Sequence, residues 1–205
     1  MLADFLSHSH TTALCDRNFK EWHEGIPYYG FWAVLIDSSD LMHRVLEAQS
    51  HLQHFFLPDY KRQAHITLNA CGLMADTRFS NSLLDRQITA LKQLTLSPFN
   101  LSVTHIDSFS TAAYLAIEDK GQVLHKINTA LSDIASDSKP SIYKPHITLG
   151  LYREAFRTEK VAQKIIQFNN FTPINTTIGE LQFCRYKTSS IQGQIEVIKK
   201  IKLAR

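Results

Sequence analysis

Apolar side chains fall into two kinds of pattern along the chain from residue 25 onward. Short runs rich in β-branched and aromatic residues predict strands at 30–37, 65–71, 99–107, 112–118, 146–152, 176–186 and 194–203. Longer segments with apolar residues at helical spacing predict helices at 38–56, 80–94, 121–135 and 158–169. The chain therefore predicts a fold in which strands and helices alternate.

The first 24 residues lack this patterning. Residues 1–24 are polar and show no periodicity, so we expect a flexible or loosely packed amino-terminal arm. No linker rich in glycine, proline or serine interrupts residues 25–205. We therefore expect residues 25–205 to form a single domain, with any lobes tightly joined.

An internal repeat organises the predicted elements. The tetrapeptide HITL occurs at 65–68 and again at 146–149, an offset of 81 residues. The preceding strand WAVLID at 32–37 aligns with YLAIED at 114–119 at an offset of 82. Each half then reads strand, helix, HITL strand, helix, strand. This duplication predicts a bilobed α+β domain with pseudo-two-fold symmetry.

The repeated motif places two polar side chains on one face of each strand. Residues i and i+2 of a strand point the same way, so His65 lies with Thr67, and His146 with Thr148. The alternate positions point to the opposite face, where the amphipathic helices must pack; these are Ile66, Leu68, Ile147 and Leu149. Two identical motifs at symmetric places indicate a functional pair more strongly than a single copy would.

The residue types indicate acid–base chemistry on a phosphate. Histidine both donates and accepts protons near neutral pH, so His65 and His146 can serve as the base and the acid of one displacement. The hydroxyls of Thr67 and Thr148 can donate to the non-bridging oxygens of a phosphodiester. A two-histidine metal site is the alternative. Threonine is a poor ligand for zinc, and neither motif has a well-placed carboxylate or cysteine beside it, so we expect no metal and no cofactor.

These motifs, in a duplicated chain of 205 residues, resemble the 2H phosphoesterase superfamily, most of all its bacterial 2′-5′ RNA ligase and cyclic phosphodiesterase branch. The resemblance covers roughly residues 27–203. It implies two lobes of antiparallel sheet, each backed by helices, with the active site in the cleft between them. It further implies His65 and His146 as the acid–base pair, with Thr67 and Thr148 as phosphate donors.

The resemblance also implies a range of substrates. Members of the superfamily hydrolyse 2′,3′-cyclic phosphates, 2′-5′ phosphodiesters or related cyclic nucleotides, and some form a 2′-5′ linkage reversibly without ATP. We therefore expect a metal-independent phosphodiesterase whose partner is RNA or a nucleotide. The alternative is a non-catalytic RNA- or nucleotide-binding module on the same scaffold.

The sequence departs from the family after the second motif. Many members of the ligase branch have an arginine within two residues of it, where this chain has Gly150 and Leu151. Strand parity places Tyr152 on the His146 face and turns Arg153 away from it, unless the strand ends or bulges. Tyr152 and Arg153 remain candidate substrate contacts, and a surface charge is an equal interpretation of Arg153.

Further candidates come from the strands that flank the motifs. The repeat alignment makes Trp32 and Tyr114 symmetric partners that face the cleft, where they would stack a nucleobase or only fill the seam between lobes. Arg62 and Lys144 enter the two motif strands and could attract a phosphate, although solvated surface charges are an alternative. Tyr186 resembles a family position at the rim of the cleft.

Composition and charge exclude several other classes. A formal net charge of +3 suits an anionic ligand but is too weak by itself to indicate duplex DNA binding. Three widely separated cysteines argue against a disulfide framework or zinc ribbon and favour a reducing compartment such as the cytoplasm. No stretch reaches the roughly 18 apolar residues that a membrane span needs. We expect a cytoplasmic monomer without a membrane segment.

Overall fold

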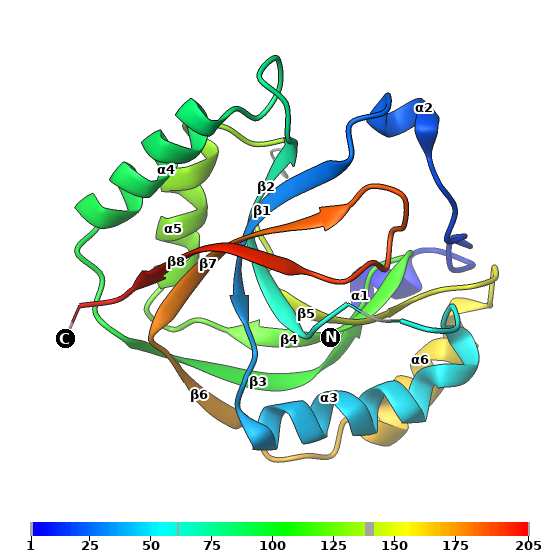
Figure 1. Cartoon of the computed structure of the whole chain (residues 1–205). Coiled ribbons are helices and arrows are strands. Elements are labelled where there is room, and N and C mark those ends of the chain that lie inside the picture. Colours follow the sequence, from blue (N-terminus) through cyan, green and yellow to red (C-terminus); the bar gives the residue numbers. More distant parts are fainter. Residues whose placement is uncertain (1, 61, 138–141, 205) are drawn as a thin grey trace.

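The structure is a computed structural model that describes residues 2–60, 62–137 and 142–204. Its strands are β1 (Tyr28–Leu35), β2 (His65–Leu73), β3 (Phe99–Ser108), β4 (Ala112–Glu118), β5 (His146–Leu151), β6 (Ile174–Ile178), β7 (Glu180–Lys187) and β8 (Glu196–Lys202). They form one antiparallel sheet in the order β6-β3-β4-β5-β2-β1-β7-β8 (Figure 1). The expected α+β fold is confirmed.

The helices are α1 (Ala3–Leu6), α2 (Lys20–His23), α3 (Ser39–Leu52), the short 3₁₀ helix η1 (Gln53–Phe55), α4 (Asn81–Gln93), α5 (Val123–Ser132) and α6 (Thr158–Phe168). The four longer helices, α3, α4, α5 and α6, lie in the segments where apolar residues at helical spacing predicted helices. At the start of α4, the Ser80 hydroxyl accepts a hydrogen bond from the backbone N–H of Leu83, as a helix N-cap does. The predicted strand 176–186 is two strands that Gly179 separates: β6 pairs with β3 in one half of the sheet, and β7 pairs with β1 and β8 in the other.

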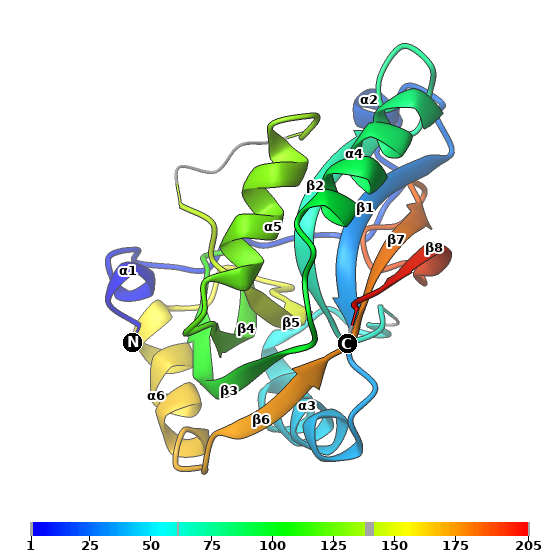
Figure 2. The same ribbon diagram turned by 90° about the vertical axis from the view of Figure 1, so that its left-hand side faces the viewer.

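The sheet has two four-stranded halves that meet at its centre. β2 and β5 share a single register pair, Ile66 with Ile147, so the two expected sheets are halves of one continuous sheet. Each half is backed by a helix pair, α4 with α5 and α3 with α6 (Figure 2). The helices exchange between the repeats, because α3 of the first repeat packs on β5 and β6 while α5 of the second packs on β2. This exchange ties the halves together.

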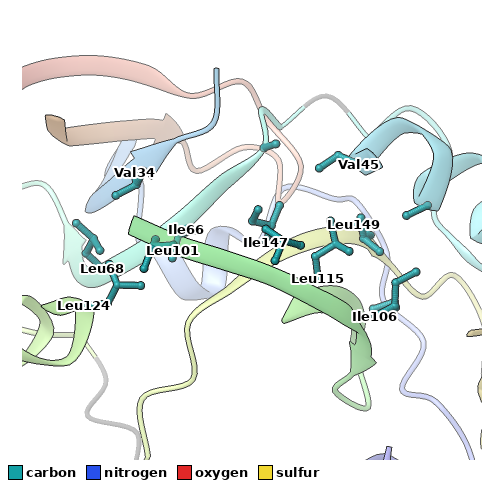
Figure 3. Close-up of a cluster of buried hydrophobic side chains, with 14 of the residues drawn as sticks. Val34, Val45, Ile66, Leu68, Leu101, Ile106, Leu115, Leu124, Ile147 and Leu149 are labelled. Carbon is teal, nitrogen blue, oxygen red and sulfur yellow. The ribbon is translucent and has the colours of Figure 1, made fainter. Parts of the chain in front are cut away.

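The face of the sheet toward the helices, here called the helix face, carries the main hydrophobic core. All four alternate residues of the two motifs are fully buried in this core, as Figure 3 shows: Ile66, Leu68, Ile147 and Leu149. Burial of such side chains contributes about 1.5–3 kcal/mol each relative to exposure. The core thereby fixes the direction of the motif strands. The histidines and threonines of the motifs lie on the opposite face, here called the histidine face, which also carries a smaller apolar cluster that includes Phe31 and Ala33.

Each motif strand contains a β-bulge directly after its threonine. Thr67 lies opposite Ala33 while Asn69 lies opposite Trp32, so Leu68 is an extra residue on its strand. In the same way Thr148 lies opposite Tyr114 while Gly150 lies opposite Ala113. A bulge shifts the alternation of side chains by one position. Residues directly after each bulge therefore face the side opposite to the one that simple parity predicts. In β2 a further register shift at Cys71 returns Leu73 to the histidine face.

The amino-terminal segment packs on the domain, which corrects the expected loosely packed arm for residues 2–14. Phe5 is 1% exposed and its ring stacks on that of Tyr152 at 6.3 Å. The backbone N–H of Thr11 donates to the carbonyl of Phe156 at 2.8 Å, and that of Leu14 to Tyr152 at 2.8 Å. These backbone bonds involve residues whose sequence gives no strand signal, so periodicity could not predict them.

No helix within residues 2–60, 62–137 and 142–204 is long and apolar enough to cross a membrane.

Candidate functional site

The two motif histidines have the same local geometry. Nδ1 of His65 bonds to the carbonyl of Gln63 at 2.7 Å, and Nδ1 of His146 to the carbonyl of Lys144 at 2.7 Å. A carbonyl oxygen only accepts hydrogen bonds, so each Nδ1 carries the proton and donates it. In the neutral form, Nε2 of each ring is left without a proton and can accept one.

The threonines lie beside the histidines of the other strand. Because β2 and β5 are antiparallel and pair at Ile66 and Ile147, the register brings Thr67 next to His146 and Thr148 next to His65. Thr67 and His146 both line a pocket of about 340 Å³. Neither threonine hydroxyl has a hydrogen-bond partner within the described part of the chain, so both are free to donate to a ligand.

Both histidines favour the neutral form. Burial lowers the pKa of His65 to about 4, since the bond to Gln63 only partly opposes it and the charges of Arg62 and His146 lower it further. Burial also lowers the pKa of His146, partly opposed by the bond to the Lys144 carbonyl, while the Lys144 charge adds to the lowering. Each neutral imidazole can therefore accept a proton, and a bound anion would stabilise the protonated ring.

Aromatic rings pack against each histidine on this face. The ring of Phe31 lies 5.6 Å from that of His65. The rings of Tyr114 and Phe109 lie 5.2 Å and 5.0 Å from that of His146. These contacts limit the rotation of both imidazoles and exclude water from one side of each.

Trp32 is not part of this site, and its pairing with Tyr114 is wrong by one residue. Trp32 is fully buried on the helix face, where its Nε1–H donates to Oε1 of Gln87 at 2.8 Å. The true equivalent of Tyr114 is Ala33, since these residues lie opposite Thr148 and Thr67. The strand before each motif therefore repeats at an offset of 81 residues, as the motif does, and not at 82. An alignment error of one residue assigns each side chain of the strand to the wrong face of the sheet.

The prediction that Tyr152 faces His146 is also wrong. Because of the bulge after Thr148, Tyr152 lies fully buried on the helix face, and its hydroxyl shares a hydrogen bond with Ser108 at 2.6 Å. Arg153 pairs with Glu154 at 3.3 Å and lines a separate pocket of about 650 Å³ that neither histidine lines. The structure thus supports the surface-charge interpretation of Arg153.

The basic residues before the motifs differ in their partners. Lys144 lines the same pocket as His146, but its ammonium pairs with Asp4 of α1 at 3.6 Å. The guanidinium of Arg62 lies over the ring of Tyr186, 4.1 Å from its centroid. Tyr186 in turn stacks on Tyr29, with 5.3 Å between ring centroids. Arg62 and Tyr186 therefore lie together on the His65 side of the histidine face.

Several site residues were missed by sequence reasoning. Phe31 precedes Trp32 and lies on the histidine face, whereas the prediction that Trp32 faces the cleft would turn Phe31 away from it. Phe109, Tyr143 and Asn128 line the pocket beside His146. Tyr143 donates its hydroxyl to the Thr67 carbonyl at 2.8 Å, and Asn128 donates to the Leu68 carbonyl at 2.7 Å. No local pattern marks these long-range contacts.

A metal does not fit the residues of this site well. Within the described ranges, no group of three or more histidine, cysteine, aspartate or glutamate side chains is placed to hold a metal ion. The donors beside the histidines are threonine hydroxyls, which are weak ligands for the metals that histidine prefers.

Comparisons with known proteins agree with this fold. A family model described as the 2′-5′ RNA ligase superfamily matches residues 38–189. A solved protein described as a phosphoesterase is similar, with a TM-score of 0.61 and 16% identity over 87% of this chain and 100% of that chain. E. coli LigT complexed with 3′-AMP has a TM-score of 0.61 and 14% identity over 87% of this chain and 99% of that one. A protein of Thermus thermophilus has a TM-score of 0.61 and 15% identity over 85% and 97%.

LigT has also been solved in complexes with ATP and with NADP⁺. No curated protein sequence matches the chain at a significant level. At such identities the structural likeness establishes the shared fold.

Proposed function

We propose a function from the following premise: the chain belongs to the 2′-5′ RNA ligase superfamily. The proposed function is that of a metal-independent phosphodiesterase acting on RNA or nucleotides. Its substrates are 2′,3′-cyclic phosphates or 2′-5′ phosphodiester bonds. The nucleotides bound in the LigT structures support a nucleotide ligand. The observation that carries the proposal is the symmetric pair His65 and His146, each held by a carbonyl at Nδ1 with a threonine from the other strand beside it.

The pair can perform a displacement at phosphorus in one site. The neutral imidazole takes a proton from water at Nε2, and the water oxygen forms a bond to phosphorus. The protonated imidazole gives its Nε2 proton to the ribose oxygen as the bond from phosphorus to that oxygen breaks. One proton enters and one leaves, so the histidines end with their roles exchanged. When the 5′-hydroxyl of a second ribose replaces water, the same displacement on a 2′,3′-cyclic phosphate forms a 2′-5′ linkage as the bond from phosphorus to the 3′ oxygen breaks.

The threonines stabilise the charge that develops on the phosphate. Hydroxyls that already point at the reacting group need no reorganisation during the reaction, and hydrogen bonds to a charged oxygen are stronger than neutral ones. In the regular antiparallel ladder, diagonal positions such as those of the two histidines are about 7–8 Å apart, which leaves room for a phosphate between the rings. The geometry thus fits in-line attack with base and acid on opposite sides of phosphorus.

The surroundings distinguish the two histidines. His65 has the charge of Arg62 beside it, and its pKa falls to about 4. The charge next to His146 belongs to Lys144, which Asp4 partly neutralises. We therefore assign the role of base in hydrolysis of the cyclic phosphate to His65 and that of acid to His146.

The test is a substrate panel with matched variants. A 2′,3′-cyclic mononucleotide and a 2′-5′ dinucleotide should be hydrolysed, while a 3′-5′ dinucleotide serves as the control. His65→Ala and His146→Ala should each reduce kcat by about 10²–10⁴, and EDTA should have no effect. Binding of a 3′-mononucleotide without turnover of any substrate would instead support the non-catalytic module. Loss of activity in EDTA that zinc restores would overturn the metal-independent mechanism.

A further inference from the structure

Arg62 is distinguished from the other arginines that lie over aromatic rings. Five such arginines occur within the described ranges: Arg17, Arg44, Arg62, Arg153 and Arg185. All but Arg62 also pair with a carboxylate, and these partners are Glu21, Glu47, Glu154 and Glu196. Arg62 has no carboxylate partner in that part of the chain. The positive charge on the His65 side of the site is therefore not neutralised by any described residue.

The unpaired atoms of Arg62 form one edge of its guanidinium. Nε and Nη2 are shielded from solvent and have no hydrogen-bond partner among the described residues. These two nitrogens are the side edge that can grip two oxygens of a phosphate at once. Buried donors without an acceptor are costly, above all on a charged group, and native structures rarely keep them without a reason.

Tyr186 holds this edge near the reacting residues. The Tyr186 ring supports the guanidinium at 4.1 Å and packs 5.8 Å from the ring of Phe31, which itself lies 5.6 Å from the ring of His65. Arg62 is also close enough to His65 for its charge to act on that imidazole. On the other side of the site, Asp4 already pairs with Lys144. Of the two cations Arg62 and Lys144, only Arg62 therefore has no carboxylate partner within the described ranges. It lies at the His65 end of the site, where its charge is available to an incoming anion.

We propose that Arg62 is a substrate-binding residue that grips a phosphate of the substrate through Nε and Nη2, with Tyr186 as the positioning residue beneath it. This proposal rests on the phosphodiesterase function proposed above. The bound phosphate is either the reacting group between the histidines or the neighbouring phosphate of an oligonucleotide. The anion completes the hydrogen bonds that the protein leaves open, and its charge offsets that of the guanidinium.

The test measures binding and does not require turnover. Inorganic phosphate and a dinucleotide with a 3′-terminal phosphate, which carries both the terminal and the neighbouring phosphate, are titrated calorimetrically into the unaltered chain, Arg62→Met and Arg62→Lys. Methionine keeps an apolar chain over Tyr186 without the charge, while lysine keeps the charge without the two-nitrogen edge. Arg62→Met should weaken binding of both ligands by about ten- to a hundredfold, with an intermediate loss for Arg62→Lys. Binding of the uncharged nucleoside should not change.

Arg44→Met is the matched control, since Arg44 also lies over an aromatic ring, Phe171, at 4.5 Å and also has a shielded Nε without a partner in the described ranges. It should leave phosphate binding unaltered. If Arg62→Met binds phosphate as tightly as the unaltered chain, Arg62 only anchors its segment to Tyr186 and the proposal is wrong. An inactive chain that still loses phosphate binding in Arg62→Met would reject the hydrolytic function and retain the anion site.

Kinetics distinguish the two possible phosphates. If Arg62 grips the reacting phosphate, Arg62→Met lowers kcat/KM for a 2′,3′-cyclic mononucleotide and for a dinucleotide ending in a cyclic phosphate by similar factors. If it grips the neighbouring phosphate, only the dinucleotide is affected. Unchanged kcat/KM for both substrates would overturn the proposal.

Discussion

Ile66 and Ile147 pair with each other where the two halves of the sheet meet, and they form the single register pair between β2 and β5. Both side chains are fully buried on the helix face. Because the flanking residues must then point the other way, this pair sets His65 beside Thr148 and His146 beside Thr67. The geometry of the candidate site thus follows from one hydrophobic contact.

The pH dependence of kcat/KM should lie on the acid side of neutrality. The proposed reaction needs neutral His65, with a pKa of about 4, and protonated His146, with a pKa below its usual 6.5. In the free protein kcat/KM should rise through pH 4 and fall again before about pH 6.5. The optimum of kcat should be higher, because a bound phosphodiester anion stabilises both protonated imidazoles. Initial rates between about pH 4 and 9 check this, and a kcat/KM that still increases above about pH 7 would contradict it.

The same burial makes a separate prediction for stability. His65 binds a proton more readily in the unfolded chain, near pH 6.5, than in the folded one, near pH 4. The unfolded state therefore takes up more protons between these values, and the free energy of unfolding should fall as pH falls from about 6.5 to 4. Urea unfolding of the protein and of His65→Gln across this range tests the sign. An equal loss in both proteins would show that His65 is not the cause.

Trp32 and Tyr114 should respond to substitution in different ways. Trp32→Phe removes the donor to Gln87 and leaves a buried acceptor with one bond fewer, so the unfolding free energy should fall by about 1–3 kcal/mol while kcat/KM is retained. Tyr114→Leu removes a ring that packs on His146, so kcat/KM should fall by about tenfold or more. Melting curves and initial rates of both variants test these two predictions. A large rise in KM for Trp32→Phe at unchanged stability would restore Trp32 as a cleft residue.

Gly150 should be essential to the second bulge. A Cβ at this position would lie 2.5 Å from ring carbons of Phe56, which is itself buried, so neither group can move away easily. Gly150→Ala should therefore cost about 1–3 kcal/mol of unfolding free energy. Gly179→Ala is the control, because no described atom lies within 4 Å of the added Cβ. Equal stabilities of the two variants in urea unfolding would argue against the close packing of Phe56 on the bulge.

The amino-terminal segment should contribute measurably to stability. Phe5 is 1% exposed, whereas its neighbour Leu6 is 46% exposed on the same short helix. Phe5→Ala should cost about 3–5 kcal/mol, since it removes a fully buried ring. Leu6→Ala should change the unfolding free energy by no more than about 0.5 kcal/mol. If both substitutions are equally mild, the segment is loosely packed after all.

The sequence alone predicted the four longer helices and most of the strands, and it proposed the four residues at the centre of the site. Helix and strand periodicity are local properties, as is the alternation within HITL that separates His65 and Thr67 from the core. The repeated motif predicted that His146 and Thr148 occupy an equivalent place. The tertiary structure decided which residues surround them.

Long-range register decided the rest. Side chains along a strand alternate with a period of two, so one extra residue reverses every side chain that follows it. The bulges after Thr67 and Thr148 depend on which residues pair across the sheet, and they turned Tyr152 to the helix face. The contact between Arg62 and Tyr186 likewise depends on β7 joining the first half of the sheet. Such pairings form between residues distant in the chain, and no local pattern encodes them.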